Sequence, residues 1–160
     1  MATIQTPVTP GGGYSSTVRK ILDIDKFGKS ANLESAVTFV TGTTGAVTEH
    51  TLLTVTGTVS LSIFAVCDVS LAGGSSTIEV GTATTTAGLI AQTTSTDIDA
   101  GKIWHDAAPN ASVELTSVLT DNIVSENIIY TVGTAAISAG ALTFLIRWAP
   151  ISSDGNVVVA

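Results

Sequence analysis

The sequence contains few of the residues that usually carry chemistry. Its 160 residues include one cysteine, Cys67, and two histidines, His50 and His105. A single cysteine excludes a disulfide or a thiolate metal cluster within one chain. Because Cys67 lies in an alternating apolar stretch, we predict a small buried side chain rather than a nucleophile. Neither histidine belongs to a pair such as H-E-x-x-H, and we expect no metal and no cofactor.

Long apolar runs are also missing. The longest one, residues 137–146, is interrupted by serine and threonine and is followed by arginine, whereas a bilayer span needs about 20 apolar residues. The opening residues, MATIQTPVTPGGG, lack the basic flank and apolar core of a secretory signal. We therefore expect a soluble protein that is made in the cytoplasm and has no membrane partner.

Charge is scarce and unevenly distributed. Charged residues make up 12% of the chain. Residues 1–30 carry four cations against two anions, a net charge of +2, and the other 130 residues carry two cations against eleven anions, a net charge of −9. We expect no nucleic-acid partner, because neutralising phosphates requires clustered lysine and arginine.

What the chain has in abundance is threonine, valine, serine, isoleucine and glycine, a composition typical of pleated strands and turns. Ten strands are expected: residues 36–41, 46–56, 58–71, 76–81, 87–93, 101–105, 112–119, 123–132, 140–149 and 155–159. This spacing predicts an all-β, antiparallel β-sandwich that is jelly-roll-like. Residues 31–160 form its single domain, and the proline- and glycine-rich residues 1–30 form an extended N-terminal arm. Within the arm, TVRKILDIDKFGKS fits helical offsets, but KILDIDKF also alternates, and extended structure is favoured.

Two expected strands are apolar on both faces. In residues 58–71 the odd-numbered side chains form an apolar face, while Phe64 and Val66 interrupt the polar one. In the stretch ALTFLIRW, Leu145 interrupts the polar face in the same way. Such residues predict either a local apolar patch under a loop or a contact surface for the arm or another subunit.

Catalytic and ligand-binding motifs are weak. No G-x-S-x-G motif and no phosphate-binding loop occur, and the separation of Glu114 and Glu126, the carboxylate pair of a conceivable glycan hydrolase, cannot be derived from the sequence. We expect no enzyme. Asp97 and Asp99 lie on one side of an extended segment and would share a calcium ion, although a solvated loop is the favoured interpretation. Trp104 and Trp148 are interpreted as core residues, with sugar stacking as the alternative.

Three segments together carry a resemblance to a known type of protein. They are the arm TPVTPGGGYSSTVRKILDIDKFG, the threonine-rich stretches TEHTLLTVTGTVSLSIFAV and EVGTATTTAGLIAQTTSTDIDAGKIW, and the closing GALTFLIRWAPISSDGNVVVA. In style and composition the chain resembles small virion proteins of tailed bacteriophages, in particular capsid decoration or cement proteins and related jelly-roll modules. The resemblance implies a homotrimer on the capsid exterior that binds the lattice of the major capsid protein and clamps its neighbours with extended termini.

The residues of the arm suit such a clamp. Proline keeps an arm extended at little entropic cost, aromatic side chains supply apolar anchors, and basic residues can meet an acidic surface. The expected arm contacts are Pro7, Pro10, Tyr14, Arg19, Lys20 and Phe27. The function expected is therefore that of a non-enzymatic structural protein that stabilises a phage capsid. The alternative is a tail-associated or host-glycan-binding sandwich with Trp104, His105 and the Asp97/Asp99 pair near its site.

Overall fold

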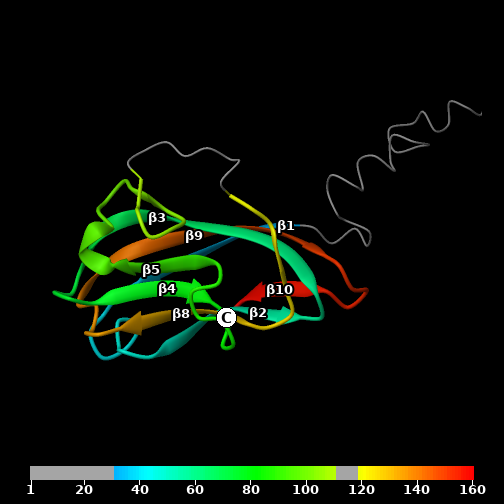
Figure 1. Ribbon diagram of the computed structural model, residues 1–160, viewed down its shortest axis with the longest axis horizontal. Helices are drawn as coiled ribbons and strands as arrows, with labels where there is room; N and C mark the ends of the chain where they lie inside the picture. Colours follow the sequence, from blue (N-terminus) through cyan, green and yellow to red (C-terminus); the bar gives the residue numbers. More distant parts are fainter. Residues whose placement is uncertain (1–30, 111–118) are drawn as a thin grey trace, which may run out of the picture.

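The computed structural model describes residues 31–110 and 119–160, which form two five-stranded antiparallel sheets (Figure 1). Sheet A contains β1 (Ala31–Thr38), β9 (Ala139–Pro150), β3 (Val59–Ala72), β6 (Ile103–Trp104) and β7 (Asn122–Val124). Sheet B contains β10 (Asn156–Val159), β2 (Glu49–Thr56), β8 (Ile128–Gly133), β4 (Thr77–Gly81) and β5 (Ile90–Thr94). A short 3₁₀ helix, Ser95–Asp97, follows β5. Figure 1 shows the sheets as two stacked layers, with β1, β3 and β9 in one and β2, β4, β5, β8 and β10 in the other.

The strands pair as a nested set. β4 pairs with β5, β3 with β6 and β7, β2 with β8, and β1 with β9, all antiparallel. A chain that rolls up around its innermost hairpin in this way has the double Greek-key connectivity of a jelly roll. β10 adds one strand to sheet B beside β2. The predicted jelly-roll-like sandwich is confirmed.

The core lies between the two sheets and follows from strand alternation. In β9, Leu142, Phe144, Ile146 and Trp148 are all buried, as their spacing predicts. Trp104 is 0% exposed, and its Nε1 donates a hydrogen bond to Thr93 Oγ1 at 2.9 Å. Since Trp104 belongs to sheet A and Thr93 to sheet B, this bond ties the two layers together. The interpretation of both tryptophans as core residues is confirmed.

Several expected boundaries are wrong, most clearly that of residues 123–132. The structure divides this stretch at residues 125–127 into β7 of sheet A and β8 of sheet B. Two side chains hold the break: Glu126 accepts hydrogen bonds from Thr84, and Asn127 Oδ1 accepts one from the N–H of Val55 at 3.0 Å.

Other strands differ at their ends. β1 begins at Ala31 and ends at Thr38, where Thr44 Oγ1 donates to the Thr38 carbonyl oxygen at 2.6 Å. The expected strand 101–105 shrinks to two residues because Gly101 has a φ of 85°, outside the strand region. The expected strand 112–119 lies outside the described residues except for its last position.

Within residues 31–110 and 119–160, no helix is long and apolar enough to cross a bilayer.

One side chain of β3 points the wrong way for simple alternation. Val69 was expected inside with Cys67 and Leu71, but it is 56% exposed. The β3–β9 register shifts between Cys67 and Val69 and again between Val69 and Ala72. A β-bulge places an extra residue on one strand and turns the following side chain to the other face, which accounts for the exposure of Val69.

Candidate interaction surface

The outer face of sheet A brings together the three residues that interrupt the polar faces in the sequence. The register pairs Phe64 of β3 with Leu145 of β9, and Val66 with Thr143. Phe64, Val66 and Leu145 are all half-buried, although they point away from the core. Ala36 of β1 lies next in the row beyond Thr143 and is exposed. We call Ala36, Phe64, Val66 and Leu145 the outer patch.

Polar contacts border the outer patch. Thr143 Oγ1 donates to Asp68 Oδ2 at 2.6 Å, and Arg147 Nη2 donates to Asp121 Oδ1 at 3.2 Å. Both contacts are exposed, and an exposed ion pair such as Arg147–Asp121 contributes about 0–1 kcal/mol to stability. Fully burying a large aliphatic or aromatic side chain contributes about 1.5–3 kcal/mol. The patch therefore offers more binding energy than its rim, because its three largest side chains still have surface to lose.

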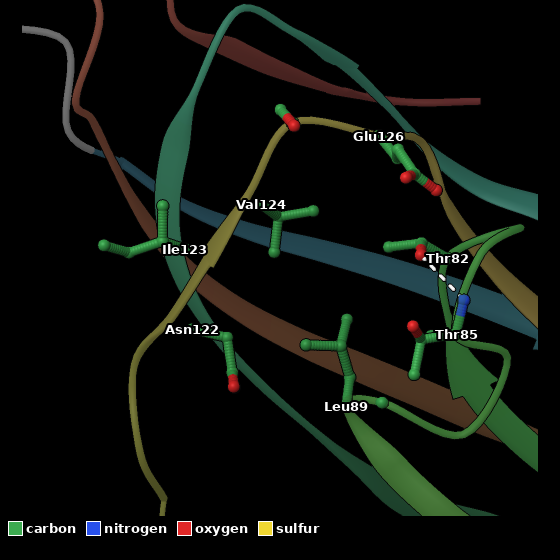
Figure 2. Close-up of a pocket in the computed structure, with 10 residues that line it drawn as sticks. Thr82, Thr85, Leu89, Asn122, Ile123, Val124 and Glu126 are labelled. Atoms are coloured by element: carbon green, nitrogen blue, oxygen red, sulfur yellow. Dashed lines mark hydrogen bonds between the residues drawn. The ribbon is translucent and has the colours of Figure 1, made fainter.

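A cleft of about 270 Å³ lies at one edge of the sandwich, between β7 and the β4–β5 loop (Figure 2). Its apolar lining is Leu89, Ile123 and Val124. Its polar lining is Thr82, Thr85, Asn122, Ser125 and Glu126, with Gly81 and Gly88 at the loop. In Figure 2, Leu89 lies beneath Val124, and Ile123 points away from both. We call this feature the edge cleft.

The loop wall of the edge cleft depends on glycine and on Glu126. A Cβ atom at Gly81 would collide with the carbonyl oxygen of Thr85, so the loop folds back closely over this position. Glu126 Oε1 accepts from Thr84 Oγ1 at 2.8 Å, and Oε2 accepts from the Thr84 N–H at 3.2 Å. Hydrogen bonds from the Thr84 and Thr82 side chains hold the pKa of the exposed Glu126 carboxyl below its usual value. The cleft therefore presents a fixed negative charge at neutral pH.

Each of the two histidines contacts neighbouring groups of the sandwich or its loops. His50 stacks on Tyr130 with ring centroids 4.7 Å apart, and its Nε2 lies 3.1 Å from the Ala46 carbonyl oxygen. Tyr130 donates its hydroxyl to the Thr44 carbonyl oxygen at 3.0 Å, and burial raises its pKa to about 12. His105 Nε2 lies 3.2 Å from Asn110 Nδ2 and 3.8 Å from Asp106 Oδ2. No group of three or more His, Cys, Asp or Glu side chains with metal-binding geometry occurs in the described part of the chain.

Cys67 is an interior residue, as predicted. It is 1% exposed, and its Sγ donates to the carbonyl oxygens of Val69 and Ile98 at 3.3 and 3.4 Å. Burial, followed by the nearby charges of Asp68 and Asp99, raises the pKa of the thiol to about 11. A thiol with such a pKa is a poor nucleophile at neutral pH.

The expected geometry of the Asp97/Asp99 pair is wrong. Asp97 belongs to the 3₁₀ helix Ser95–Asp97, so the two residues do not share one side of an extended segment. Lys102 Nζ forms a 3.0 Å ion pair with Asp99 and donates to the Asp97 carbonyl oxygen at 2.8 Å. The Asp99 carboxylate is thus paired with a lysine ammonium.

The expected arm contacts lie outside the described residues: Pro7, Pro10, Tyr14, Arg19, Lys20 and Phe27. Glu114 lies outside them as well, so the Glu114/Glu126 pair has no measured separation. The sequence did not predict the edge cleft. The one signal for it was the run of threonines and glycines in GTATTTAG, which favours a tight loop. Comparison with protein-family models, with curated proteins and with solved structures finds no match for this chain.

Proposed function

We propose that this protein is a non-enzymatic structural protein of a bacteriophage particle, which self-associates through the outer patch and stabilises the capsid from outside. Jelly rolls recur in viral capsids, in lectins and in enzymes of the cupin type, so the fold alone does not choose among them. The observation that carries the proposal is the outer patch. Phe64, Val66 and Leu145 form a continuous apolar surface on a sheet face against which no sheet of residues 31–110 and 119–160 packs.

The arm completes the proposed assembly. Its net charge of +2 complements the net charge of −9 on the rest of the chain, so arms would be attracted to neighbouring copies as well as to acidic capsid surfaces. Many copies on one lattice would also raise the effective concentration of each contact, which allows individually weak contacts to hold firmly.

The alternative of a glycan-binding module loses its main support. Trp104 is 0% exposed and cannot serve as a stacking platform, and Trp148 is buried on the inner face of β9. The described residues that line the edge cleft include no aromatic side chain. Of the residues that the alternative places near its site, Trp104 therefore offers no stacking surface.

Titration of capsids tests the proposal. Capsids of the phage that encodes the chain, prepared without this protein, would be mixed with the full-length chain, and the bound copies and the temperature of capsid disruption would be measured. We expect saturable binding and a higher disruption temperature. The variant Phe64→Asp should bind at least about tenfold more weakly, because a charge replaces a buried contact.

A matched variant on the other sheet serves as the control. Thr54→Asp places the same charge on the outer face of sheet B, where Thr54 is exposed, and should bind like the unmodified chain. The double variant Arg19→Glu/Lys20→Glu tests the arm in the same assay. Absence of the chain from purified particles, or equal binding of Phe64→Asp and Thr54→Asp, would contradict the proposal.

A further inference from the structure

The edge of β7 that faces away from β3 has peptide groups available for pairing. In β3, Cys67 exchanges backbone hydrogen bonds with Lys102 and Gly101 on the β6 side, whereas the Thr58 carbonyl oxygen accepts from Ile151 on the β9 side. Peptide groups alternate in direction along a strand. Between Val59 and Cys67 the register is continuous, so the odd-numbered residues of β3 bond toward β6 and β7.

This alternation determines which residue of β7 is unpaired. Ile123 lies opposite Ser60, an even-numbered residue, so its N–H and C=O point away from β3. Apart from the pairing of β7 with β3, no backbone hydrogen bond joins Ile123 to residues 31–110 or 119–160. Its side chain is also 72% exposed, the highest value among the exposed large hydrophobic residues. A free strand edge of this kind is a template for pairing with another extended chain.

The edge cleft lies directly beside this strand edge. Ile123, Val124 and Glu126 form its wall on the β7 side (Figure 2). A peptide that pairs with Ile123 would therefore place alternate side chains in the cleft, against Leu89 and Val124. The Glu126 carboxylate would lie within reach of a basic side chain of that peptide.

We propose that residues 20–26 of a second copy of this chain add a strand to the free edge of β7 and fill the edge cleft. In an extended KILDIDK segment, Lys20, Leu22, Ile24 and Lys26 share one face. That face has two aliphatic side chains between two cations. It matches a cleft with aliphatic walls and a fixed carboxylate. The proposal deepens the proposed function by naming what the arm binds, and it rests on that function only for the arm's role in assembly.

The layout of sheet A favours a second copy over the chain's own arm. Ala31, Trp148, Leu61 and Asn122 form one row across the sheet, so Ala31 lies three strand spacings, about 14 Å, from Asn122. An arm that reached its own β7 would have to cross the outer faces of β9 and β3. The outer patch lies three residues further along the same two strands, and a neighbouring copy associated there would bring its arm to β7 without that crossing.

Photocrosslinking in mixed full-length chains tests this arrangement. Ile24→p-benzoylphenylalanine would be introduced in unlabelled chain and mixed with ¹⁵N-labelled unmodified chain. Mass spectrometry of the crosslinked peptides then distinguishes pairs within one copy from pairs between copies. We expect light-to-heavy crosslinks to residues 82–89 or 122–126. The same probe at Ile21, on the opposite face of the segment, is the matched control and should give at least about tenfold fewer such crosslinks.

A second pair of variants tests the backbone contact. Ile123→Pro removes the N–H that points away from β3 together with the isoleucine side chain, and it removes no N–H that bonds to β3, so the β3–β7 ladder remains intact. It should reduce the Ile24 crosslinks about tenfold, while Ile123→Ala, which keeps the N–H, should retain most of them. A thermal melt of both variants checks that each is folded.

Each remaining outcome would overturn the proposal. Crosslinks confined to a single copy would show that the arm covers its own cleft. Crosslinks to other residues, or a yield that Ile123→Pro leaves unchanged, would show that β7 is not the acceptor. This experiment contains no capsid, so it can succeed even where the capsid titration fails, and the two proposals are separable.

Discussion

The outer faces of the two sheets differ in a way that the inner faces do not. Both inner faces are apolar and buried, because each covers the other. The outer face of sheet B presents the exposed residues Glu49, Thr51 and Thr54, and the Glu79 carboxylate accepts from Gln92 at 2.9 Å. Its apolar side chains are Val158, beside Thr54, and Ile129, beside Thr51, so β2 lies between them. The outer face of sheet A has Phe64, Val66 and Leu145 at its centre instead. The apolar side chains on the outer face of sheet A are thus in direct register, whereas those on the outer face of sheet B are separated.

This difference is informative because both faces belong to the same fold. A jelly roll needs apolar residues only on the inner faces of its sheets. The outer face of sheet B shows that this sandwich folds without a paired apolar cluster on an outer face. The paired apolar residues on the outer face of sheet A are therefore not a requirement of the fold, and the proposed association rests on them.

The largest expected effect separates the two faces of β9. Phe144→Ala removes a fully buried ring that packs edge-on against Trp104, with ring centroids 6.3 Å apart, and should lower the free energy of unfolding by about 3–5 kcal/mol. Leu145→Ala, one residue along on the outer face, should lower it by about 1 kcal/mol or less in dilute protein. Urea unfolding of both variants measures this difference. Equal losses would show that Leu145 is a core residue.

Association should respond to charge on one face alone. Phe64→Asp should raise the dissociation constant of the oligomer at least about 30-fold, the effect of removing a contact of about 2 kcal/mol. Thr54→Asp, on the outer face of sheet B, should leave the constant nearly unchanged. Sedimentation equilibrium of the two variants makes the comparison. A greater effect of Thr54→Asp would reverse our assignment of the faces.

Thiol labelling sharpens the comparison residue by residue. Native Cys67 should react very slowly with a maleimide at pH 7, because it is buried and its pKa is raised to about 11. In a Cys67→Ser background, Val66→Cys should react rapidly in dilute protein and at least about tenfold more slowly once the protein associates. Thr54→Cys in the same background is the control and should react equally fast in dilute protein and at the concentration where the protein associates.

The smallest expected effect concerns the edge cleft. The pKa of Glu126 is lowered in the folded chain, so its ionised form stabilises the fold above the unfolded pKa, and this contribution is lost as pH falls through the folded value. Glu126→Gln should make the melting temperature slightly less sensitive to pH between about 5 and 3. Thr84→Val, which removes the hydroxyl donor, should have a similar effect. If the melting temperature of both variants fell with acid as steeply as that of the unmodified chain, the hydrogen-bonded geometry of Glu126 would be contradicted.

Much of the fold followed from alternation in the sequence. The sandwich, the inward face of β9 and the buried positions of Cys67 and Trp104 could all be predicted, because period-two patterns determine which side chains face the core. Phe64, Val66 and Leu145 were recognisable as exceptions to that pattern. Their direct pairing across β3 and β9 depends on register, which the two segments do not specify separately.

The features that the sequence did not reveal depend on local breaks and on distant neighbours. Residues 123–132 include three consecutive polar residues, 125–127, and the structure breaks the strand there, with Glu126 contacting Thr84 and Asn127 contacting Val55. Val69 follows the apolar pattern until a bulge turns it outward. The edge cleft requires β7 and the β4–β5 loop, which lie about 40 residues apart in the chain and meet only through the nested pairing.

The most direct test of the account is the solution mass of the unmodified full-length chain, measured by light scattering over a range of concentrations. The outer patch predicts reversible self-association, and the resemblance to decoration proteins predicts a trimer, with a mass three times the 16.2 kDa of one chain. An oligomer that dissociates on dilution would support the account. The Phe64→Asp variant should dissociate at a higher protein concentration than the Thr54→Asp variant. A monomer at every concentration would contradict the claim that the outer face of sheet A is an association surface.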